Sequence, residues 1–186
     1  MIIGKTIMQT YLALDVPLRK ESRWFNALKT ALRDYPVSWQ NGFYHITMVF
    51  IDENPKHIDL KPIFRKHLST AVAPVLEFNK IDVFTANNGK EHIINLTSTI
   101  VPDSFISLIE SIRYDLKQVG CILESDFKLH VTLGRLDTST FDLTTLTSIV
   151  DQVKITPFSL VLTDAHFKVR GSKKNPIDSI ILKTKK

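Results

Sequence analysis

Residues 43–51 read FYHITMVFI, and this stretch decides the fold because residues 127–136, FKLHVTLGRL, repeat its pattern in the second half of the chain. Both are apolar runs typical of β-strands, and each contains a His-x-Thr tripeptide, which begins at His45 or at His130. Side chains two apart on a strand leave the same face, so each strand presents one imidazole beside one hydroxyl. Two such strands facing each other predict a cleft with two groups that titrate near neutral pH and two hydroxyl donors.

A third tripeptide of similar type, HLS at residues 67–69, does not fit this site. It lies in residues 59–72, where apolar side chains recur at helical spacing. Residues two apart on a helix point about 200° away from each other, so this imidazole and hydroxyl cannot share a face. We therefore interpret His67 as structural, and we give the same interpretation to the other histidines outside the two motifs, His57, His92 and His166.

The predicted elements follow a similar order in both halves of the chain. In the first half we expect strands at 7–14, 43–51, 76–83 and 92–97, and helices from 17 to 32 and from 59 to 72. In the second half we expect helices at 103–119 and 142–152, and strands at 128–134, 158–167 and 177–182. Asn87-Asn88-Gly89 indicates a tight hairpin turn. Each motif histidine precedes the tip of a hairpin by about 42 residues, a spacing typical of an internal repeat.

These patterns predict the α+β fold class. We expect a bilobal, pseudo-twofold duplicated fold, in which two antiparallel sheets flank a central cleft and the helices lie on the outside. Residues 1–186 are long enough to form one domain with a sizeable core. Its lobes are expected at approximately 1–100 and 101–186, and strands can exchange between them.

Composition and charge narrow the class of protein. There is no apolar run near the 18 residues that a membrane span needs, and we expect a cytoplasmic monomer that does not bind a membrane. The single cysteine, Cys121, excludes an internal disulfide and a thiolate zinc site, and its apolar surroundings indicate a core position. We therefore expect no metal site.

The net charge of +5 is concentrated near the end of the chain. The segment 168–186 carries seven Lys or Arg residues against Asp178 alone, a local charge of +6, so the remainder is close to neutral. A polyanion could bind beside this terminal hairpin by releasing counterions. A solvated hairpin that keeps the protein soluble is an equally good interpretation.

The sequence around both tripeptides resembles a known family. YHITMVFIDENP at 44–55 is similar to the first motif of the 2H phosphoesterase superfamily, and FKLHVTLGR at 127–135 is similar to the second. The opening strand YLALDVP at 11–17, the separation of the motifs and the arginine after the second motif resemble the 2'-5' RNA ligase or RNA 2',3'-cyclic phosphodiesterase (LigT-like) branch. The resemblance covers nearly the whole chain. It implies a bilobal α+β fold, no metal and no cofactor.

The resemblance also assigns roles to particular residues. It implies that His45 is the proton donor and His130 the proton acceptor. Independently of it, opening a cyclic phosphate needs a base on one side of phosphorus and an acid on the other, and imidazole can serve as either near neutral pH. Thr47 and Thr132 are expected to donate hydrogen bonds to the non-bridging phosphate oxygens. The chain departs from many relatives at Leu129, where they have proline.

Arg135 lies where the family has an arginine that binds phosphate or nucleotide. Strict alternation along a strand places Arg135 on the face opposite His130 and Thr132. It therefore reaches the site only if the strand ends or bulges at Gly134.

The motifs predict an enzyme that hydrolyses 2',3'-cyclic phosphodiesters of RNA ends or nucleotides to 2'-phosphates, with reversible 2'-5' RNA ligation. Its partner is therefore RNA or a nucleotide with a cyclic phosphate. Three alternatives remain open at this point: a 2'-5' oligonucleotide or RNA 3'-end phosphodiesterase, an enzyme for a cyclic ADP-ribose derivative, and a catalytically silent RNA-binding module. Some aromatic residues could stack a base, but we interpret them as core: Tyr11, Phe43, Tyr44 and Phe167.

Overall fold

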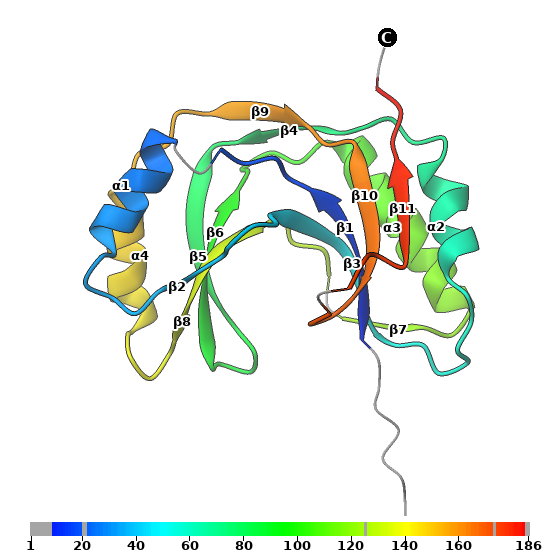
Figure 1. The fold of residues 1–186 in the computed structure, drawn as a ribbon, viewed down its shortest axis with the longest axis horizontal. Coiled ribbons are helices and arrows are strands. Elements are labelled where there is room, and N and C mark those ends of the chain that lie inside the picture. Colours follow the sequence, from blue (N-terminus) through cyan, green and yellow to red (C-terminus); the bar gives the residue numbers. More distant parts are fainter. Residues whose placement is uncertain (1–8, 20–21, 125, 173, 185–186) are drawn as a thin grey trace, which may run out of the picture.

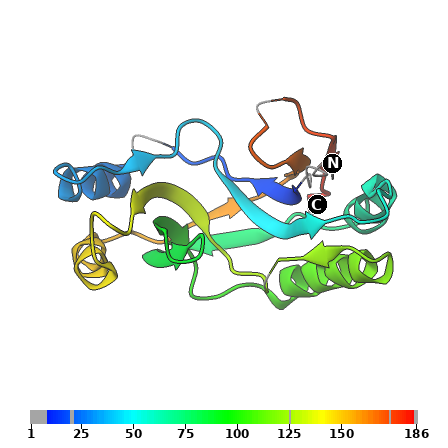
Figure 2. The same ribbon diagram turned by 90° about the horizontal axis from the view of Figure 1, so that it is seen from below.

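The computed structural model describes residues 9–19, 22–124, 126–172 and 174–184. The strands form an arch that is open on one side, with two helices at each end (Figure 1). Seen from the open side, the strands lie between the two pairs of helices (Figure 2). The first residues of the predicted strand 7–14, and Lys173, Lys185 and Lys186 of the basic segment, lie outside the described residues.

One end of the arch, which we call the β3 side, contains five strands and two helices. They are β1 (Thr10–Asp15), β3 (His45–Glu53), β7 (Ile122–Leu123), β10 (Asp164–Val169), β11 (Asp178–Ile181), α2 (Lys61–Leu68) and α3 (Asp103–Gln118). The other end, the β8 side, contains four strands and two helices. They are β2 (Ser38–Trp39), β5 (Lys80–Ala86), β6 (Glu91–Thr97), β8 (Val131–Asp137), α1 (Arg23–Ala31) and α4 (Leu143–Asp151). Each side thus draws elements from both halves of the sequence.

The two sides meet at one pair of residues. Their strands run in the order β11-β10-β1-β3 and β8-β6-β5, all neighbours being antiparallel, and β3 joins β8 through the pair Ile46 and Val131. An antiparallel pair has a local twofold axis between its residues. Each motif histidine comes one residue before this pair and each motif threonine one residue after it. The predicted α+β fold with antiparallel sheets is confirmed, and the twofold axis passes between the two motifs.

A small second sheet lies across the top of the arch, on the side away from the opening (Figure 1). It pairs β4 (Val75–Phe78) with β9 (Phe158–Val161). The predictions of single strands at 76–83 and 158–167 were therefore wrong: each is two strands, and its first part belongs to this small sheet. The apolar alternation changes phase at both breaks: the apolar positions are 76 and 78 before the first break and 81 and 83 after it, and 158, 160 and 162 before the second and 165 and 167 after it. The prediction of single strands overlooked this change of phase.

The remaining predicted elements agree with the structure, except that α1 begins at Arg23 and not at residue 17. The hairpin turn places Asn87, Asn88 and Gly89 at φ values of 52°, 55° and 84°, the left-handed region that Asn and Gly tolerate best. Gly120 follows α3 at φ 92° and ends it. The strands β2 and β7 were not predicted, because a two-residue strand has no detectable period.

The core supports the structural roles that the sequence assigned. Buried apolar side chains from both sides form a continuous cluster, which includes Cys121 at 6% exposure. His67 lies on α2, where its Nε2 is 2.8 Å from an oxygen of Asp115 on α3. Among the residues that the structure describes, no helix is both long and apolar enough to cross a membrane.

Candidate active site

Each His-x-Thr tripeptide is followed at once by a β-bulge. Along β3, Thr47 pairs with Ala13 and Val49 with Leu12, so Met48 is left between them. Along β8, the register shifts at the corresponding place, immediately after Thr132. A bulge adds one residue to a strand and reverses the alternation beyond it. The residue three places after each threonine therefore returns to the face of the histidine.

In β8 the residue brought back by the bulge is Arg135. It pairs with Ile93 of β6, and both line the same cleft as the motif residues. The equivalent residue of β3 is Phe50, which pairs with Tyr11 and also lines the cleft. The condition under which Arg135 could reach the site, a bulge beside Gly134, is thus met in the structure.

Gly134 has no room for a side chain. A Cβ atom there would lie 2.7 Å from Cγ1 of Val37 and 3.1 Å from the Trp39 ring. Because β2 packs against β8 at this point, with Trp39 paired to Gly134, the glycine lets the two strands approach.

We therefore expect Gly134→Ala to lower the free energy of unfolding by about 1–3 kcal/mol, the usual cost of overpacking. Urea denaturation of both proteins measures this. The variant should also shift Arg135 within the cleft, because Arg135 is the next residue. Unchanged stability would mean that Val37 and Trp39 can move aside freely.

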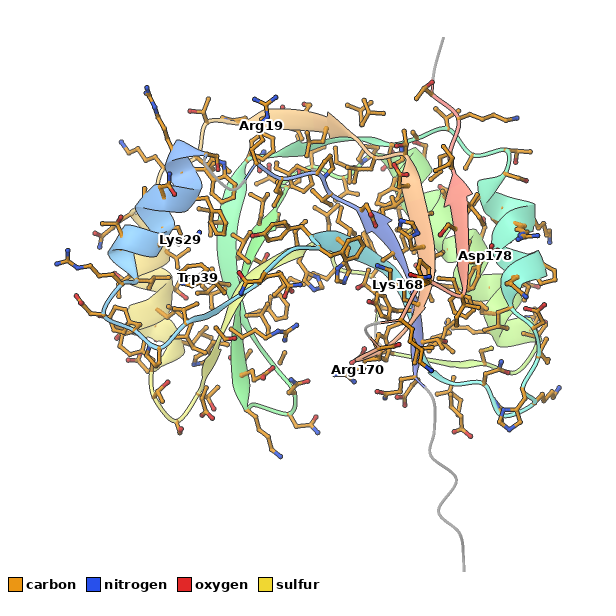
Figure 3. The ribbon with its side chains drawn as sticks, in the orientation of Figure 1. Arg19, Lys29, Trp39, Lys168, Arg170 and Asp178 are labelled. Carbon is orange, nitrogen blue, oxygen red and sulfur yellow. The ribbon has the colours of Figure 1, made fainter. Side chains whose placement is uncertain are left out.

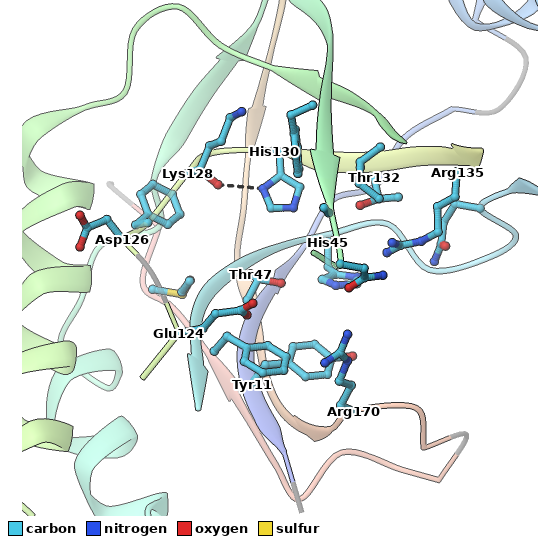
Figure 4. A pocket seen from close by; sticks show the side chains of 18 of the residues that line it. Tyr11, His45, Thr47, Glu124, Asp126, Lys128, His130, Thr132, Arg135 and Arg170 are labelled. Atoms are coloured by element: carbon cyan, nitrogen blue, oxygen red, sulfur yellow. Dashed lines mark hydrogen bonds between the residues drawn. The ribbon is translucent and has the colours of Figure 1, made fainter. Parts of the chain in front are cut away.

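The cleft has a volume of about 580 Å³ and contains all the residues that the sequence assigned to the site (Figure 4). These residues are His45, Thr47, His130, Thr132 and Arg135. In Figure 4 the two imidazoles come from opposite strands, with the two threonines beside them. The structure thus brings the five predicted residues together in one concave space.

Both imidazoles are largely buried, and this favours their neutral forms. Burial, with the nearby charges of Lys168, His130 and Arg135, lowers the pKa of His45 to about 4. Burial also lowers the pKa of His130, and Lys128 and Arg135 lower it further. Histidines that remain neutral near pH 7 can accept protons, and an anionic substrate between them would favour protonation of one of them.

Backbone carbonyls orient the imidazoles. Nδ1 of His130 is 2.9 Å from the carbonyl oxygen of Lys128, two residues upstream, so Nδ1 carries the proton in the neutral ring and donates it there (Figure 4). The carbonyl of Phe43 lies two residues upstream of His45 and raises the pKa of His45. Nδ1 of His45 is nevertheless buried without a hydrogen bond that meets the distance and angle criteria. Because Nδ1 of His130 donates to the Lys128 carbonyl, its Nε2 is the nitrogen that can accept a proton within the cleft.

Aromatic rings flank both imidazoles. The Phe43 ring stacks on His45 with centroids 5.1 Å apart, and Tyr11 lies 5.5 Å from His45. On the other side Phe84 meets His130 edge to face at 5.2 Å. The interpretation of Tyr11 and Phe43 as core residues was therefore wrong, because both line the cleft and are only partly buried. Tyr44 and Phe167 are buried, as expected.

Several charged residues of the cleft were not predicted. Arg135 donates from Nη1 to Oε2 of Glu91 on β6 at 3.2 Å, and Glu91 itself does not line the cleft. Lys128 and Arg170 line opposite parts of the cleft, and Glu124 lies between them and the helices of the β3 side. Lys128 could have been found from the sequence, since it precedes His130 by two residues. Arg170 belongs to the basic segment 168–186 that the distribution of charge singled out, but nothing in the local sequence places it in the cleft.

The remaining histidines make structural contacts. His92 is buried, and its ring nitrogens lie 3.0 Å from Oγ1 of Thr85 and 2.9 Å from the Phe141 carbonyl. His166 pairs with Asp15 at 3.2 Å and contacts the edge of the Phe43 ring. In the described part of the chain, no three His, Cys, Asp or Glu side chains are grouped so as to hold a metal ion.

Comparison with known proteins shows similarity in structure. No family model matches the sequence, and no curated protein matches it. Among solved structures, Escherichia coli LigT in complex with 3'-AMP superposes with a TM-score of 0.57 at 16% identity, covering 95% of this chain and 98% of LigT. Kluyveromyces marxianus Usb1 superposes with a TM-score of 0.61 at 9% identity, covering 94% and 98%. A structure described as a phosphoesterase gives 0.53 at 16% identity, covering 94% and 98%.

The structural similarity covers nearly the whole of this chain and of each neighbour, so the complete arch is shared and not only one motif. They agree with the resemblance that the two His-x-Thr motifs carry. This protein has the same fold as LigT and Usb1.

Proposed function

We propose that this protein is a metal-independent phosphoesterase that opens 2',3'-cyclic phosphodiesters of RNA ends or nucleotides and leaves a 2'-phosphate. The observation that carries the proposal is the twofold placement of His45 and His130 about the pair Ile46 and Val131. It supplies a base and an acid on opposite sides of one small space. The nucleotide complexes of its structural neighbours, LigT with 3'-AMP and Usb1 with uridine monophosphate, support a nucleotide ligand for this cleft.

The chemistry follows from this placement. One imidazole takes a proton from water, whose oxygen attacks phosphorus, and the bond from phosphorus to O3' breaks. The other imidazole gives its proton to O3', so the product carries a 2'-phosphate and a free 3'-hydroxyl. Thr47 and Thr132 donate hydrogen bonds to the two non-bridging oxygens, and Arg135 offsets their negative charge. The same steps, with a 5'-hydroxyl in place of water, join the two ends through a 2'-5' linkage, and the reverse of these steps cleaves that linkage.

The direction of proton transfer is part of the proposal. We assign His45 as donor and His130 as acceptor, as the motif resemblance implies. In the free protein the pKa of His45 is lowered to about 4, so His45 must gain its proton together with the phosphate anion. A negative phosphodiester beside His45 raises its pKa and opposes the effect of Lys168 and Arg135.

The lowered pKa values give a prediction for the pH dependence of kcat/KM. Because both pKa values lie below the usual value of about 6.5, both imidazoles of the free protein are neutral above that pH. The fraction of protein molecules that carry one protonated imidazole then falls about tenfold for each unit of rising pH. We expect kcat/KM to reach its maximum below about pH 6.5 and to decline above it. A rise in kcat/KM between pH 6.5 and 8 would contradict this.

The substrate class is tested by comparing products from three substrates of equal length. These are an RNA with a 2',3'-cyclic end, a 2'-5' linked oligonucleotide and an RNA with a free 3'-hydroxyl. The proposal expects fastest turnover of the cyclic end, with phosphorus NMR showing a 2'-phosphate. Faster shortening of the RNA with a free 3'-hydroxyl would favour an RNA 3'-end phosphodiesterase. Turnover of none of them would favour an RNA-binding module.

A further inference from the structure

Asp15 of β1 and His45 of β3 lie directly opposite each other, and each has a buried polar atom without a hydrogen bond. They are a register pair of two antiparallel strands, so their side chains leave the same face with Cβ atoms about 4.5–5.5 Å apart. In the described part of the chain, neither Oδ1 of Asp15 nor Nδ1 of His45 has a hydrogen-bond partner. Such atoms are rare in folded proteins, because a buried polar group without a hydrogen bond costs free energy.

The other carboxylate oxygen of Asp15 is held by His166 of β10. Nε2 of His166 lies 3.2 Å from Oδ2 of Asp15, and Nδ1 of His166 lies 2.8 Å from Oγ of Ser179 on β11. The Phe43 ring stacks on His45 and meets His166 at a steep angle, with centroids 5.1 Å and 6.2 Å away. Asp15 is therefore fixed through one oxygen, and the other oxygen remains for His45.

Charges on three strands act on this pair, and burial acts on it most strongly. The titratable and charged groups that face it come from β1, β8 and β10: Tyr11, His130, Arg135, Asp164, His166 and Lys168. Burial is the first cause that lowers the pKa of His45 and the first cause that raises the pKa of Asp15. Lys168, which Figure 3 shows on the β3 side toward the opening of the arch, lowers both pKa values. An imidazolium and a carboxylate in contact would each offset the cost of burying the other.

The twofold axis shows that His130 has a different neighbour on the adjacent strand. Continued by one residue, the register of β6 and β8 sets Thr97 opposite His130, as Asp15 lies opposite the other histidine. The Thr97 hydroxyl donates to the Leu129 carbonyl at 2.5 Å. Nδ1 of His130 already donates to a backbone carbonyl, which is a neutral acceptor. A carboxylate opposite the motif histidine is thus a property of the β3 side.

Two acidic residues line the cleft elsewhere. Glu124 and Asp126 lie in the segment that leads to β8, and Asp126 pairs with Arg113 at 3.7 Å. Burial lowers the pKa of His130, and neither acidic residue opposes this effect. In the part of the chain that the structure describes, Asp15 is therefore the carboxylate that is set opposite a motif imidazole.

We propose that Asp15 is the positioning residue that makes His45 the acid: its Oδ1 accepts the Nδ1 proton of His45 once substrate binding has protonated that imidazole. This inference rests on the proposed function, because it assigns the two roles of that reaction. His45 takes a proton from solvent as the phosphate anion binds, and both ring nitrogens then donate, Nδ1 to Asp15 and Nε2 to O3'. When the bond from phosphorus to O3' breaks, O3' takes the Nε2 proton and Nδ1 keeps its own. His130, which faces no carboxylate, stays neutral and takes the proton of water.

The experiment follows the protonation of each imidazole by NMR, so it does not depend on turnover. Isotope-labelled imidazoles are titrated with pH in the wild-type protein and in Asp15→Asn, both saturated with adenosine 2'-phosphate. Asparagine keeps the size of the side chain and removes its charge. We expect the substitution to lower the proton affinity of His45 at least about tenfold, the lower end of the usual effect of a close opposite charge. The proton affinity of His130 should not fall.

Asp164→Asn is the matched control. It removes a carboxylate that acts on Asp15 but does not lie opposite either motif histidine, and it should change the proton affinity of His45 by about twofold at most. A second measurement needs no variant and decides between the outcomes if Asp15→Asn does not fold. In the wild-type nucleotide complex, the Nδ1 proton of His45 should give a separate, slowly exchanging signal, and the free protein should give none.

Three results would overturn the pairing of Asp15 with His45. They are an unchanged titration of His45 in Asp15→Asn, an equal loss in Asp164→Asn, and a wild-type complex without the Nδ1 signal. A fall in proton affinity at both His45 and His130 would count equally against it, because it would indicate a general disturbance of the cleft. If His45 titrates as expected but the protein opens no cyclic phosphate, the proposed function fails and the pairing stands.

Discussion

Replacing either cleft histidine by alanine should lower kcat for a 2',3'-cyclic nucleotide by about 100-fold to 10,000-fold, the span that one general acid or base contributes. His45→Ala and His130→Ala each remove one of the two proton carriers and leave the rest of the cleft in place. KM should change far less, because threonines and Arg135 hold the phosphate. Steady-state kinetics of both variants at several pH values measure the effect.

The control is His67→Ala, which alters the HLS tripeptide of α2. Neither His67 nor its partner Asp115 lines the cleft, so turnover should remain within about twofold of wild type. A substrate with sulfur in place of O3' identifies the acid, because a thiolate leaves without a proton more readily than an alkoxide. The turnover of His45→Ala, which lacks the proposed acid, should recover with this substrate, and the turnover of His130→Ala should not. Recovery of His130→Ala alone would reverse the assigned roles.

Removing one threonine hydroxyl should have the second largest effect. Thr47→Val and Thr132→Val keep the shape of the side chain but remove a donor to the phosphate, which usually costs about 100-fold to 1000-fold in kcat. Because the two threonines are related by the twofold axis, we expect losses of similar size. Kinetics of both variants, with Thr47→Ser and Thr132→Ser as matched controls that keep the hydroxyl, test this. Equal activity of valine and serine variants would show that these hydroxyls do not contact the phosphate.

Much of the site could be predicted because it depends on local rules. The alternation of each motif strand places His45 beside Thr47, and His130 beside Thr132, before any tertiary contact is known. Placing Arg135 in the cleft required a bulge in its strand. Gly134 indicated where the bulge lies, and a larger residue at this position would collide with Val37 and Trp39. The bulge after Thr47 carries no glycine, so the same reversal at Phe50 was not foreseen.

Other features could not be predicted because they arise from long-range pairing. Lys168 and Arg170 reach the cleft only because β10 pairs with β1, a partner more than 150 residues away in sequence. Tyr11 and Phe43 look like core residues in an apolar stretch, and their partial exposure follows from their positions lining the cleft. The small β4 and β9 sheet likewise depends on two distant segments meeting across the arch.

The central claim is that two histidines from opposite strands open a cyclic phosphate without a metal. The most direct measurement is single-turnover hydrolysis of a 2',3'-cyclic nucleotide by protein treated with a chelator, beside the same preparation carrying His45→Ala and His130→Ala together. The account predicts full activity of the treated wild-type protein and none above background for the double variant. Loss of wild-type activity on chelation that a divalent cation restores, or undiminished activity of the double variant, would contradict it.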